Sequence, residues 1–319
     1  MRVAAGSAVA VERESAHAPP QTAAGDRAGR MRPMYVVWAI IFLAALAVLL
    51  VKAAEPTALA GPFATVASFL TWTTLAVAAM AFACEFIDST LGMGYGTTLT
   101  PVLLLLGYEP LEIVPAVLLS QLLTGITGGL LHHGAGNVRF ARGSRHLHVV
   151  IVLVACSIVG AWPAALVATH VSQEALKGFI GTIVLAVGVV MLATINRTVG
   201  FSWVKIAGLG VIAGFNKAIS GGGYGPVVVG GQVVSGLDPK NAVGVTSMAE
   251  GVTCIVGVAT YALTVGIDAR LALPLVLGAM CSVPLAVFSV KAVPARGLRI
   301  GISILTLVLG TVTIVTVLW

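Results

Sequence analysis

The sequence predicts an all-α polytopic membrane protein, and three observations support this. The chain of 319 residues is 58% hydrophobic and only 9% charged, whereas soluble domains carry about 25% charged residues. Its mean hydropathy is +1.03. Apolar runs of about 20 residues, the length that crosses a bilayer as a helix, recur along it. A glycine-rich motif occurs twice, so we expect two homologous repeats of about five helical segments each.

The duplicated motif organises the chain. Its first copy spans 86–110, FIDSTLGMGYGTTLTPVLLLLGYEP, and its second copy spans 215–239, FNKAISGGGYGPVVVGGQVVSGLDP, an offset of 129 residues. The residues that coincide at this offset are mostly glycines: Phe86/Phe215, Gly92/Gly221, Gly94/Gly223, Tyr95/Tyr224, Gly96/Gly225, Gly107/Gly236, Pro110/Pro239, Thr124/Thr253 and Gly128/Gly257. Identity at a fixed offset indicates an internal duplication. Two glycine-interrupted hydrophobic segments at corresponding positions indicate the binding site of a transporter.

In chain order, the polar and alanine-rich stretch 1–33 is predicted to be a disordered tail, without the apolar core of a signal peptide. Residues 34–61 hold an extra transmembrane helix and a linker. The first repeat is expected at 62–195 and the second at 200–319. The apolar runs that could span a bilayer are 35–51, 63–82, 111–131, 149–169, 175–194, 202–218, 242–265, 271–290 and 298–318.

Two shorter apolar pieces, 97–106 and 226–234, follow the glycine clusters and decide the topology. If each completes a crossing, each repeat has an odd number of crossings and the repeats are inverted. With the N-terminus in the cytoplasm, most basic residues then fall on the cytoplasmic side, as membrane proteins prefer: Arg139, Arg142, Arg145, Arg197, Lys205, Lys240, Lys291, Arg296 and Arg299. This favours crossing. The alternative, short pieces that re-enter, would give four crossings per half and parallel repeats.

The motif resembles that of the TauE/SafE sulfite exporter family, also called the toluene sulfonate uptake permease family. The matching residues are Gly92-Met-Gly-Tyr-Gly96 with Gly107 and Pro110, and Gly221-Gly-Gly-Tyr-Gly225 with Gly236 and Pro239. The first copy departs from the second in having Met93 where the second has Gly222. The resemblance covers about 70–318 and implies transport of sulfite, sulfonates or related organosulfur anions across a bacterial inner membrane.

The glycine clusters are too rich in glycine for a continuous helix, and a half-helix is expected to begin after each. A helix N-terminus binds anions through its free N–H groups and its dipole. Two such termini facing each other would form an anion site from Gly94, Tyr95, Gly96, Thr97 and Thr98 in one repeat and Gly222, Gly223, Tyr224 and Gly225 in the other. The alternative is that the glycines only permit close helix packing.

Lys217 is the most informative single residue, because a charged side chain at membrane depth is costly and usually functional. We expect it to bind the substrate anion, with Asn216 donating a further hydrogen bond; alternatively it extends to the interface. Asp88 is the residue that corresponds to Lys217 at the repeat offset. A further hypothesis pairs Asp88 with Lys217 in the empty site. Glu85 is expected to face the cytoplasmic interface.

A polar stripe recurs on the helices after the short pieces: Gln121 and Thr124 in the first repeat, and Thr246, Glu250 and Thr253 in the second. The spacings of three and four place each set on one helical face. Glu250 is a candidate proton carrier, or a protonated group that only bonds a neighbouring helix. Tyr95 and Tyr224 could bond the substrate or simply fill the glycine gaps.

These features favour a secondary transporter for a small organosulfur anion, with an anion channel that uses the same helix termini and Lys217 as the alternative. An enzyme is not expected, since no catalytic pair with convincing spacing lies at membrane depth. The cysteines lack metal-site spacing. The histidines that flank the arginines of 139–145, which are His132, His133, His146 and His148, could hold a metal but are better explained by a basic interfacial loop, so neither metal nor cofactor is predicted. Without a concentrated basic face, no nucleic-acid partner is expected. The predicted partners are the lipid bilayer and the small anion, with a homodimer possible.

Overall fold

The computed structural model describes residues 71–194, 201–234, 237–290 and 295–318, and parts of 36–47. The predicted tail, most of the extra helix with its linker, and residues 195–200 lie outside this part. All regular secondary structure in the described residues is helical, which confirms the predicted all-α class. The helices are α3 (Trp72–Leu91), α4 (Tyr95–Leu105), α5 (Pro110–Gly134), α6 (Arg145–Ala168), α7 (Gln173–Thr194), α8 (Trp203–Ser220), α9 (Tyr224–Val234), α10 (Pro239–Thr264), α11 (Ala269–Ser289) and α12 (Ala295–Leu318).

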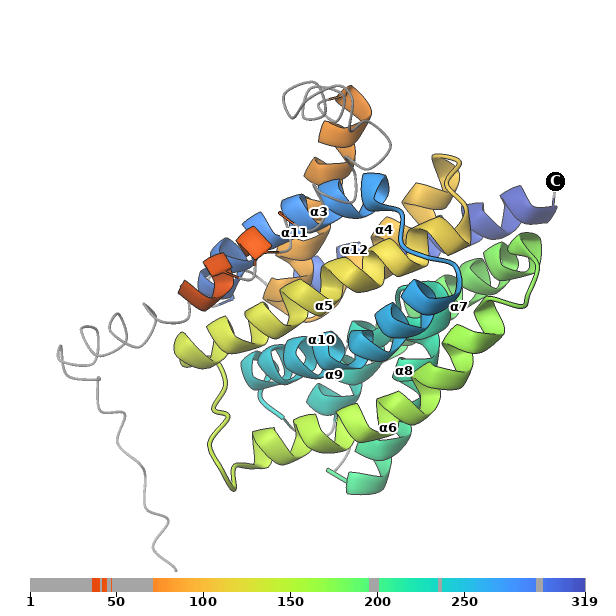
Figure 1. Cartoon of the computed structure of the whole chain (residues 1–319). Helices are drawn as coiled ribbons and strands as arrows, with labels where there is room; N and C mark the ends of the chain where they lie inside the picture. Colours follow the sequence, from red (N-terminus) through yellow and green to blue (C-terminus); the bar gives the residue numbers. More distant parts are fainter. Residues whose placement is uncertain are drawn as a thin grey trace, which may run out of the picture.

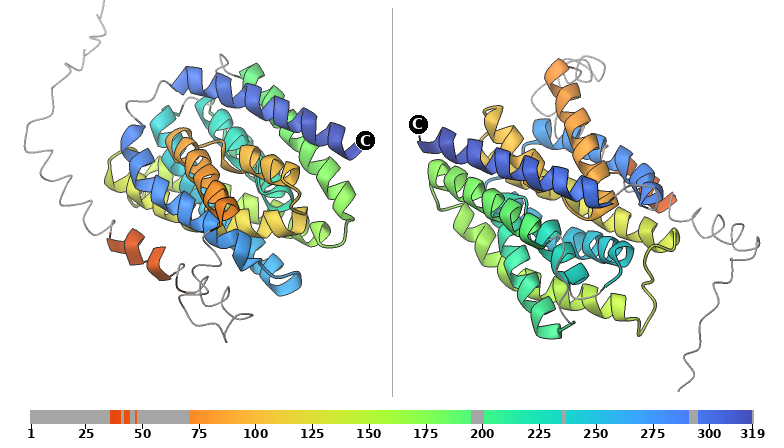
Figure 2. Two further views of the ribbon diagram at one scale, coloured as in Figure 1. Left: turned by 90° about the horizontal axis from the view of Figure 1, so that it is seen from above. Right: turned by 180° about the vertical axis from the view of Figure 1, so that it is seen from behind.

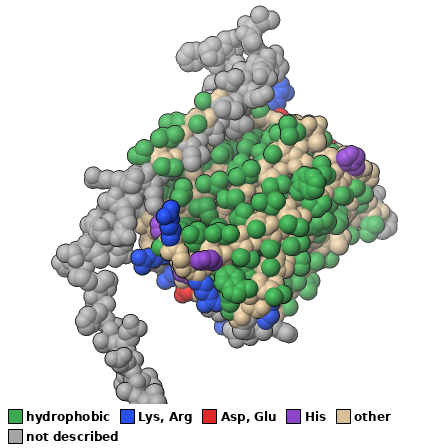
Figure 3. All heavy atoms as spheres, turned by 60° about the horizontal axis from the view of Figure 1, so that its bottom comes forward, with side chains coloured by type: hydrophobic (Ala, Val, Ile, Leu, Met, Phe, Trp, Pro, Cys, Tyr) green, Lys and Arg blue, Asp and Glu red, His purple; other side chains and the backbone are tan. Residues whose placement is uncertain are grey.

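Seven helical stretches of the described residues are long and apolar enough to cross a membrane: α3, α5, α6, α7, α10, α11 and the Ile300–Leu318 part of α12. The molecule is therefore a multi-pass membrane protein. Its outer surface agrees with this assignment, because large hydrophobic side chains such as Trp162, Val204 and Leu263 are exposed. Hydrophobic side chains cover most of the face in Figure 3, whereas Lys and Arg gather toward one edge.

The helices pack in pairs, each of which joins a helix of 72–194 to a helix of 203–318. α5 lies against α10 in the middle of the bundle (Figure 1), and α7 lies against α12 along its back (Figure 2). α3 packs mainly on α11, and α8 mainly on α6. Small residues allow the closest approach, since a Cβ at Gly125 would lie 2.7 Å from the Cα of Gly251. This is the small-residue packing expected of membrane helices.

The pairs α5–α10 and α7–α12 run antiparallel. Along α5 and α10, Gly257 faces Leu118 while Gly129 faces Met248. Along α7 and α12, Gly181 faces Ile314 while Gly188 faces Leu307. Helices that correspond at the 129-residue offset therefore point in opposite directions.

The bundle has two chemically different ends. One end, which we call the Arg145 end, contains the turn 135–144 and the beginnings of α6, α8 and α10. The guanidinium of Arg145 lies 3.8 Å from the centre of the Phe201 ring, just before α8, and Gly244 of α10 faces Val138. The other end, which we call the Glu109 end, contains the beginnings of α5, α7 and α11. There Lys177 forms an ion pair of 3.1 Å with Glu109.

Each short helix turns back toward the end from which the preceding helix came. On α8 and α9, Gly223 lies beside Asn216 and Gly231 beside Leu209, so these two helices form an antiparallel hairpin that starts and finishes at the Arg145 end.

The α3–α4 pair does the same at the Glu109 end. α3 runs parallel to α5, since Glu85 lies beside Thr124 and Ser89 beside Gly128. α4 runs back toward the beginning of α5. The expectation that 97–106 and 226–234 complete crossings is therefore wrong. The glycines between the paired helices let the chain reverse, which the apolar runs alone did not reveal.

Candidate anion-binding site

Two glycine segments cross at backbone contact in the middle of the bundle. The first, 92–96, joins α3 to α4, and the second, 221–225, joins α8 to α9. Gly92 and Gly221 end their helices with φ of 73° and 71°, in the left-handed region that glycine adopts readily. A side chain on Gly96 would collide with the carbonyl oxygen of Gly221, and one on Gly225 would collide with that of Gly92. Only glycine allows the two segments to cross this closely.

Lys217 lies at this crossing and forms a buried ion pair. Its side chain is 1% exposed, and it is the only Lys or Arg among the buried residues that the structure describes. Its Nζ lies 2.7 Å from Oε1 of Glu250 and donates to the carbonyl oxygen of Gly221 at 3.1 Å. It also donates to Oε1 of Gln121, whose Nε2 donates to Oε1 of Glu250 at 3.2 Å. In this structure Glu250 is the ion-pair partner of Lys217, and no ion pair between Lys217 and Asp88 forms among the described residues.

Asp88 instead supplies a carboxylate to the N-terminus of α4. Its Oδ1 accepts a hydrogen bond of 3.1 Å from the backbone N–H of Tyr95, and the side chain is buried. A carboxylate at this position favours the helix by occupying a free N–H group and opposing the dipole. At the equivalent place before α9 the chain has Lys217. One helix start thus has a carboxyl group of the protein at its N–H groups, whereas the other has the Lys217 ammonium beside it.

Two buried hydroxyl groups beside the crossing lack partners. The Oγ1 atoms of Thr97 and Thr100 have no hydrogen bond among the described residues, although their side chains are 1% and 0% exposed. Thr100 Oγ1 lies 3.1 Å from the position that a Cβ at Gly221 would take. Gly222 lies against the backbone nitrogen of Thr97. Because buried hydroxyls normally find a partner, these two point to a ligand at the second glycine segment.

The other predicted site residues mostly bond within the protein. The Tyr95 hydroxyl lies 2.8 Å from the Ser120 Oγ, and the Tyr224 hydroxyl lies 3.1 Å from the Ser157 Oγ. Both tyrosines are fully buried. Thr246 accepts from Gln232 at 2.9 Å, and Thr253 donates to the carbonyl oxygen of Ala249 at 2.7 Å. Thr98 is half-buried on α4. Tyr95 therefore hydrogen-bonds the first glycine segment to α5, and Tyr224 hydrogen-bonds the second to α6.

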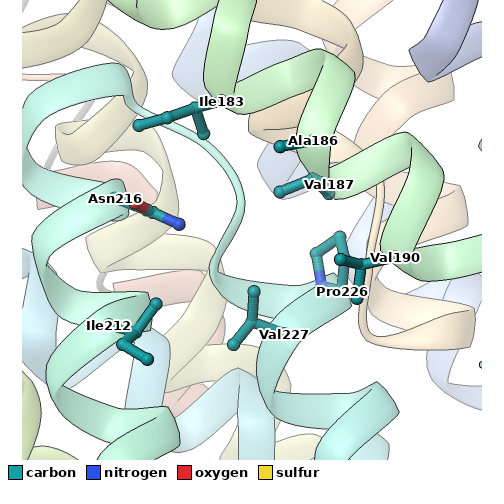
Figure 4. Close-up of a pocket in the computed structure, with 8 residues that line it drawn as sticks. All are labelled: Ile183, Ala186, Val187, Val190, Ile212, Asn216, Pro226 and Val227. Carbon is teal, nitrogen blue, oxygen red and sulfur yellow. The ribbon is translucent and has the colours of Figure 1, made fainter.

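Asn216 faces a separate cavity of about 270 Å³ between α7, α8 and α9 (Figure 4). Its walls are otherwise apolar: Ile183, Ala186, Val187, Val190, Ile212, Pro226 and Val227. At the 129-residue offset Asn216 corresponds to Ile87, whose Cγ2 would lie 3.3 Å from a Cβ at Gly94. An isoleucine thus fills the space on the α3–α4 side that stays open on the α8–α9 side.

Three polar residues of this region were missed or misplaced by sequence reasoning. Glu85 was expected at the cytoplasmic interface, but it is 2% exposed inside the bundle. Ser89 and Thr100 were not singled out. The spacing of Glu85, Asp88 and Ser89 by three and four residues puts them on one helical face, a signal that could have located them.

Comparison with known proteins identifies the family. The model of the family described as Sulfite exporter TauE/SafE matches residues 76–313. The chain therefore belongs to this family of membrane transporters.

A relative is the probable membrane transporter protein YtnM of Bacillus subtilis (strain 168), which is 29% identical over 192 residues. That region is 57% of this chain and 62% of the relative, so the match spans less than two thirds of the relative's length. No solved structure matches the chain.

Proposed function

We propose that this protein is a secondary transporter that moves a small sulfur-containing anion, such as sulfite or a sulfonate, across the bacterial inner membrane. The observation that carries the proposal is the buried Lys217 at the crossing of the two glycine segments. An ammonium inside a membrane protein is costly and marks substrate pathways. Among the described residues its one ion-pair partner is Glu250, at 2.7 Å.

The anion competes with Glu250 for Lys217. A sulfonate or sulfite oxygen can accept from the ammonium, from the buried Thr97 and Thr100 hydroxyls, and from backbone N–H groups where α9 begins. The corresponding start of α4 already holds the Asp88 carboxylate. We expect the substrate anion to bind at the start of α9 in the way that Asp88 binds at the start of α4. Because Asp88 already occupies the start of α4, a single substrate anion is expected.

Inverted repeats support alternating access at this site. Each repeat consists of one helical hairpin and three long helices, so an odd number of crossings separates the two copies of the motif. The antiparallel pairs α5–α10 and α7–α12 support the inversion, since repeats of the same orientation would run parallel there. Rocking of one repeat against the other would expose Lys217 to each side in turn.

Orientation follows from the basic residues. Arg139, Arg142, Arg145, Lys205 and Lys240 are exposed and belong to the Arg145 end. The positive-inside rule makes this the cytoplasmic end. The family description favours export, and the membrane potential favours it as well. One anion moving outward across 100 mV, negative inside, gains about 2.3 kcal/mol.

A channel is the less favoured alternative. A channel needs a continuous pore, whereas the two glycine segments meet with no room for a Cβ between them. Counterflow in proteoliposomes separates the two: labelled anion accumulates against its gradient when unlabelled anion is trapped inside a transporter vesicle, and a channel gives no such accumulation.

The binding site is tested by thermal unfolding with sulfite, sulfate, taurine, sulfoacetate, toluene sulfonate and chloride. A ligand at 100 times its Kd adds about 2.7 kcal/mol to stability. Thr100→Val is the sharpest variant, because the hydroxyl it removes has no hydrogen-bond partner among the described residues. We expect it to fold normally and bind the anion more weakly. Lys217→Met should abolish the shift, and Lys177→Met, at the surface, should keep it. If the anion raises the unfolding temperature of Lys217→Met and Thr100→Val as much as that of the wild type, this site is refuted.

A further inference from the structure

We infer that Glu85 is a proton-binding site whose occupancy is linked to anion binding at Lys217; the linkage, though not the bound proton, rests on the proposed function. Glu85 lies on α3, three residues before Asp88, and is 2% exposed. Its Oε1 accepts a hydrogen bond of 2.7 Å from the Ser89 hydroxyl, and the Thr124 hydroxyl lies beside the same carboxyl. Its Oε2 is buried and has no hydrogen-bond partner among the described residues.

No cation among the residues that the structure describes balances Glu85. Lys217 is engaged with Glu250 and Gln121. His132 approaches from α5, but its Nε2 lies 2.9 Å from the carbonyl oxygen of Ser89 and its Nδ1 lies 3.0 Å from Asn137 Nδ2. The amide nitrogen can only donate, so Nδ1 accepts and His132 is the neutral Nε2–H tautomer.

The remaining titratable groups near Glu85 add no positive charge. They are Cys84 and Asp88 on α3, Tyr95 on α4, and Glu250 and Cys254 on α10. On α11, which packs along α3, the titratable Arg270 and Cys281 are both exposed.

A proton bound to Glu85 would neutralise a carboxyl group that has no counter-charge nearby among the described residues. An ionised carboxylate buried without a counter-charge is far more costly than a neutral carboxyl that leaves one hydrogen bond unmade. The Ser89 hydroxyl donates to Oε1, which leaves Oε2 as the atom that carries the proton. The site is also specific to one half of the molecule. At the 129-residue offset Glu85 corresponds to Gly214, where a Cβ would lie 2.6 Å from the Cα of Ser157.

The proton and the anion favour each other's binding. Loss of the proton from Glu85 would add a negative charge beside Asp88 and Glu250, within the cluster that surrounds Lys217. That charge would repel an incoming anion and strengthen the competition for the ammonium. Because linkage is reciprocal, an anion bound at Lys217 would hold the proton on Glu85 more tightly. The carrier would then move the anion together with a proton.

Infrared spectroscopy tests the bound proton without any substrate. A protonated carboxylic acid has a C=O stretch that a carboxylate lacks, and the band shifts in heavy water. The purified protein near neutral pH should show such a band, and Glu85→Gln should lose it. Glu112→Gln is the matched control, because Glu112 only caps the start of α5. A band that is absent from the wild type, or unchanged in Glu85→Gln, overturns the inference.

Binding across pH tests the linkage. Toluene sulfonate stays ionised over the pH range of such a titration, so any pH dependence of its Kd comes from groups of the protein. The wild-type Kd should rise with pH by up to tenfold per unit, the limit for one linked proton. In Glu85→Gln the Kd should be nearly independent of pH. If the Kd of Glu85→Gln still depends on pH, the linkage is refuted. It is also refuted if the Kd of the wild type changes with the Na⁺ concentration and not with pH. If no anion binds at all, the proposed function fails while the infrared result still decides the proton site.

Discussion

Breaking the Lys217–Glu250 ion pair should destabilise the protein far more when one partner is lost than when both are made neutral. Lys217→Met keeps the length of the side chain but removes the ammonium. It leaves the Glu250 carboxylate, which is 4% exposed, with the Gln121 amide as its hydrogen-bond donor. Glu250→Gln leaves the ammonium without a carboxylate partner and with neutral carbonyl acceptors such as those of Gln121 and Gly221.

The magnitude follows from the burial of both partners. Removing one member of a buried ion pair costs about 3–5 kcal/mol, because an uncompensated charge stays inside. The double variant Lys217→Met with Glu250→Gln has no such charge, and replacing a buried pair by neutral side chains is often close to neutral. The singles together should therefore cost about 6–10 kcal/mol and the double about 2 kcal/mol or less.

Thermal unfolding in detergent measures this difference. A loss of 1 kcal/mol lowers Tm by about 2–4 °C in domains of 150–250 residues, so each single variant should lose about 6–20 °C. Lys177→Met is the control, because its ion pairs with Glu109 and Glu174 are partly exposed and such pairs contribute about 1 kcal/mol or less. Singles that cost under 1 kcal/mol, or a double variant whose loss equals their sum, would refute the buried pair as the central contact.

Three further predictions concern the same region. Gly225→Ala should destabilise by about 1–3 kcal/mol or more through overpacking at the crossing, whereas Gly230→Ala, with nothing within 4 Å of its Cβ position, should be neutral or stabilising; equal Tm values would contradict the close crossing. Asp88→Ala should cost about 0.5–2 kcal/mol by removing the acceptor for the Tyr95 N–H, and unchanged Tm in thermal unfolding would argue against that role. Val187→Phe should fill part of the cavity of about 270 Å³ without changing Tm by more than a few degrees; a large loss of stability would mean that the cavity cannot accept a ring.

Several properties of this protein depend on local sequence and could be predicted from it. The all-helical class follows from composition and from the length of the apolar runs. The family follows from the glycines, tyrosines and prolines that recur at a fixed offset. Lys217 could be recognised as important because a charge is rare and costly at membrane depth, whichever helices surround it.

Other properties depend on which helices become neighbours. The partner of Lys217 is on α10, and Gln121 comes from α5, so no spacing along the chain predicts that triad. Glu85 looked like an interfacial residue, because its burial depends on how α5, α10 and α11 enclose α3. The return of α4 and α9 toward their starting ends depends on the crossing of two glycine segments that lie 129 residues apart. A sequence shows the cost of a buried charge or of a glycine break, but only the packed structure decides which groups compensate it.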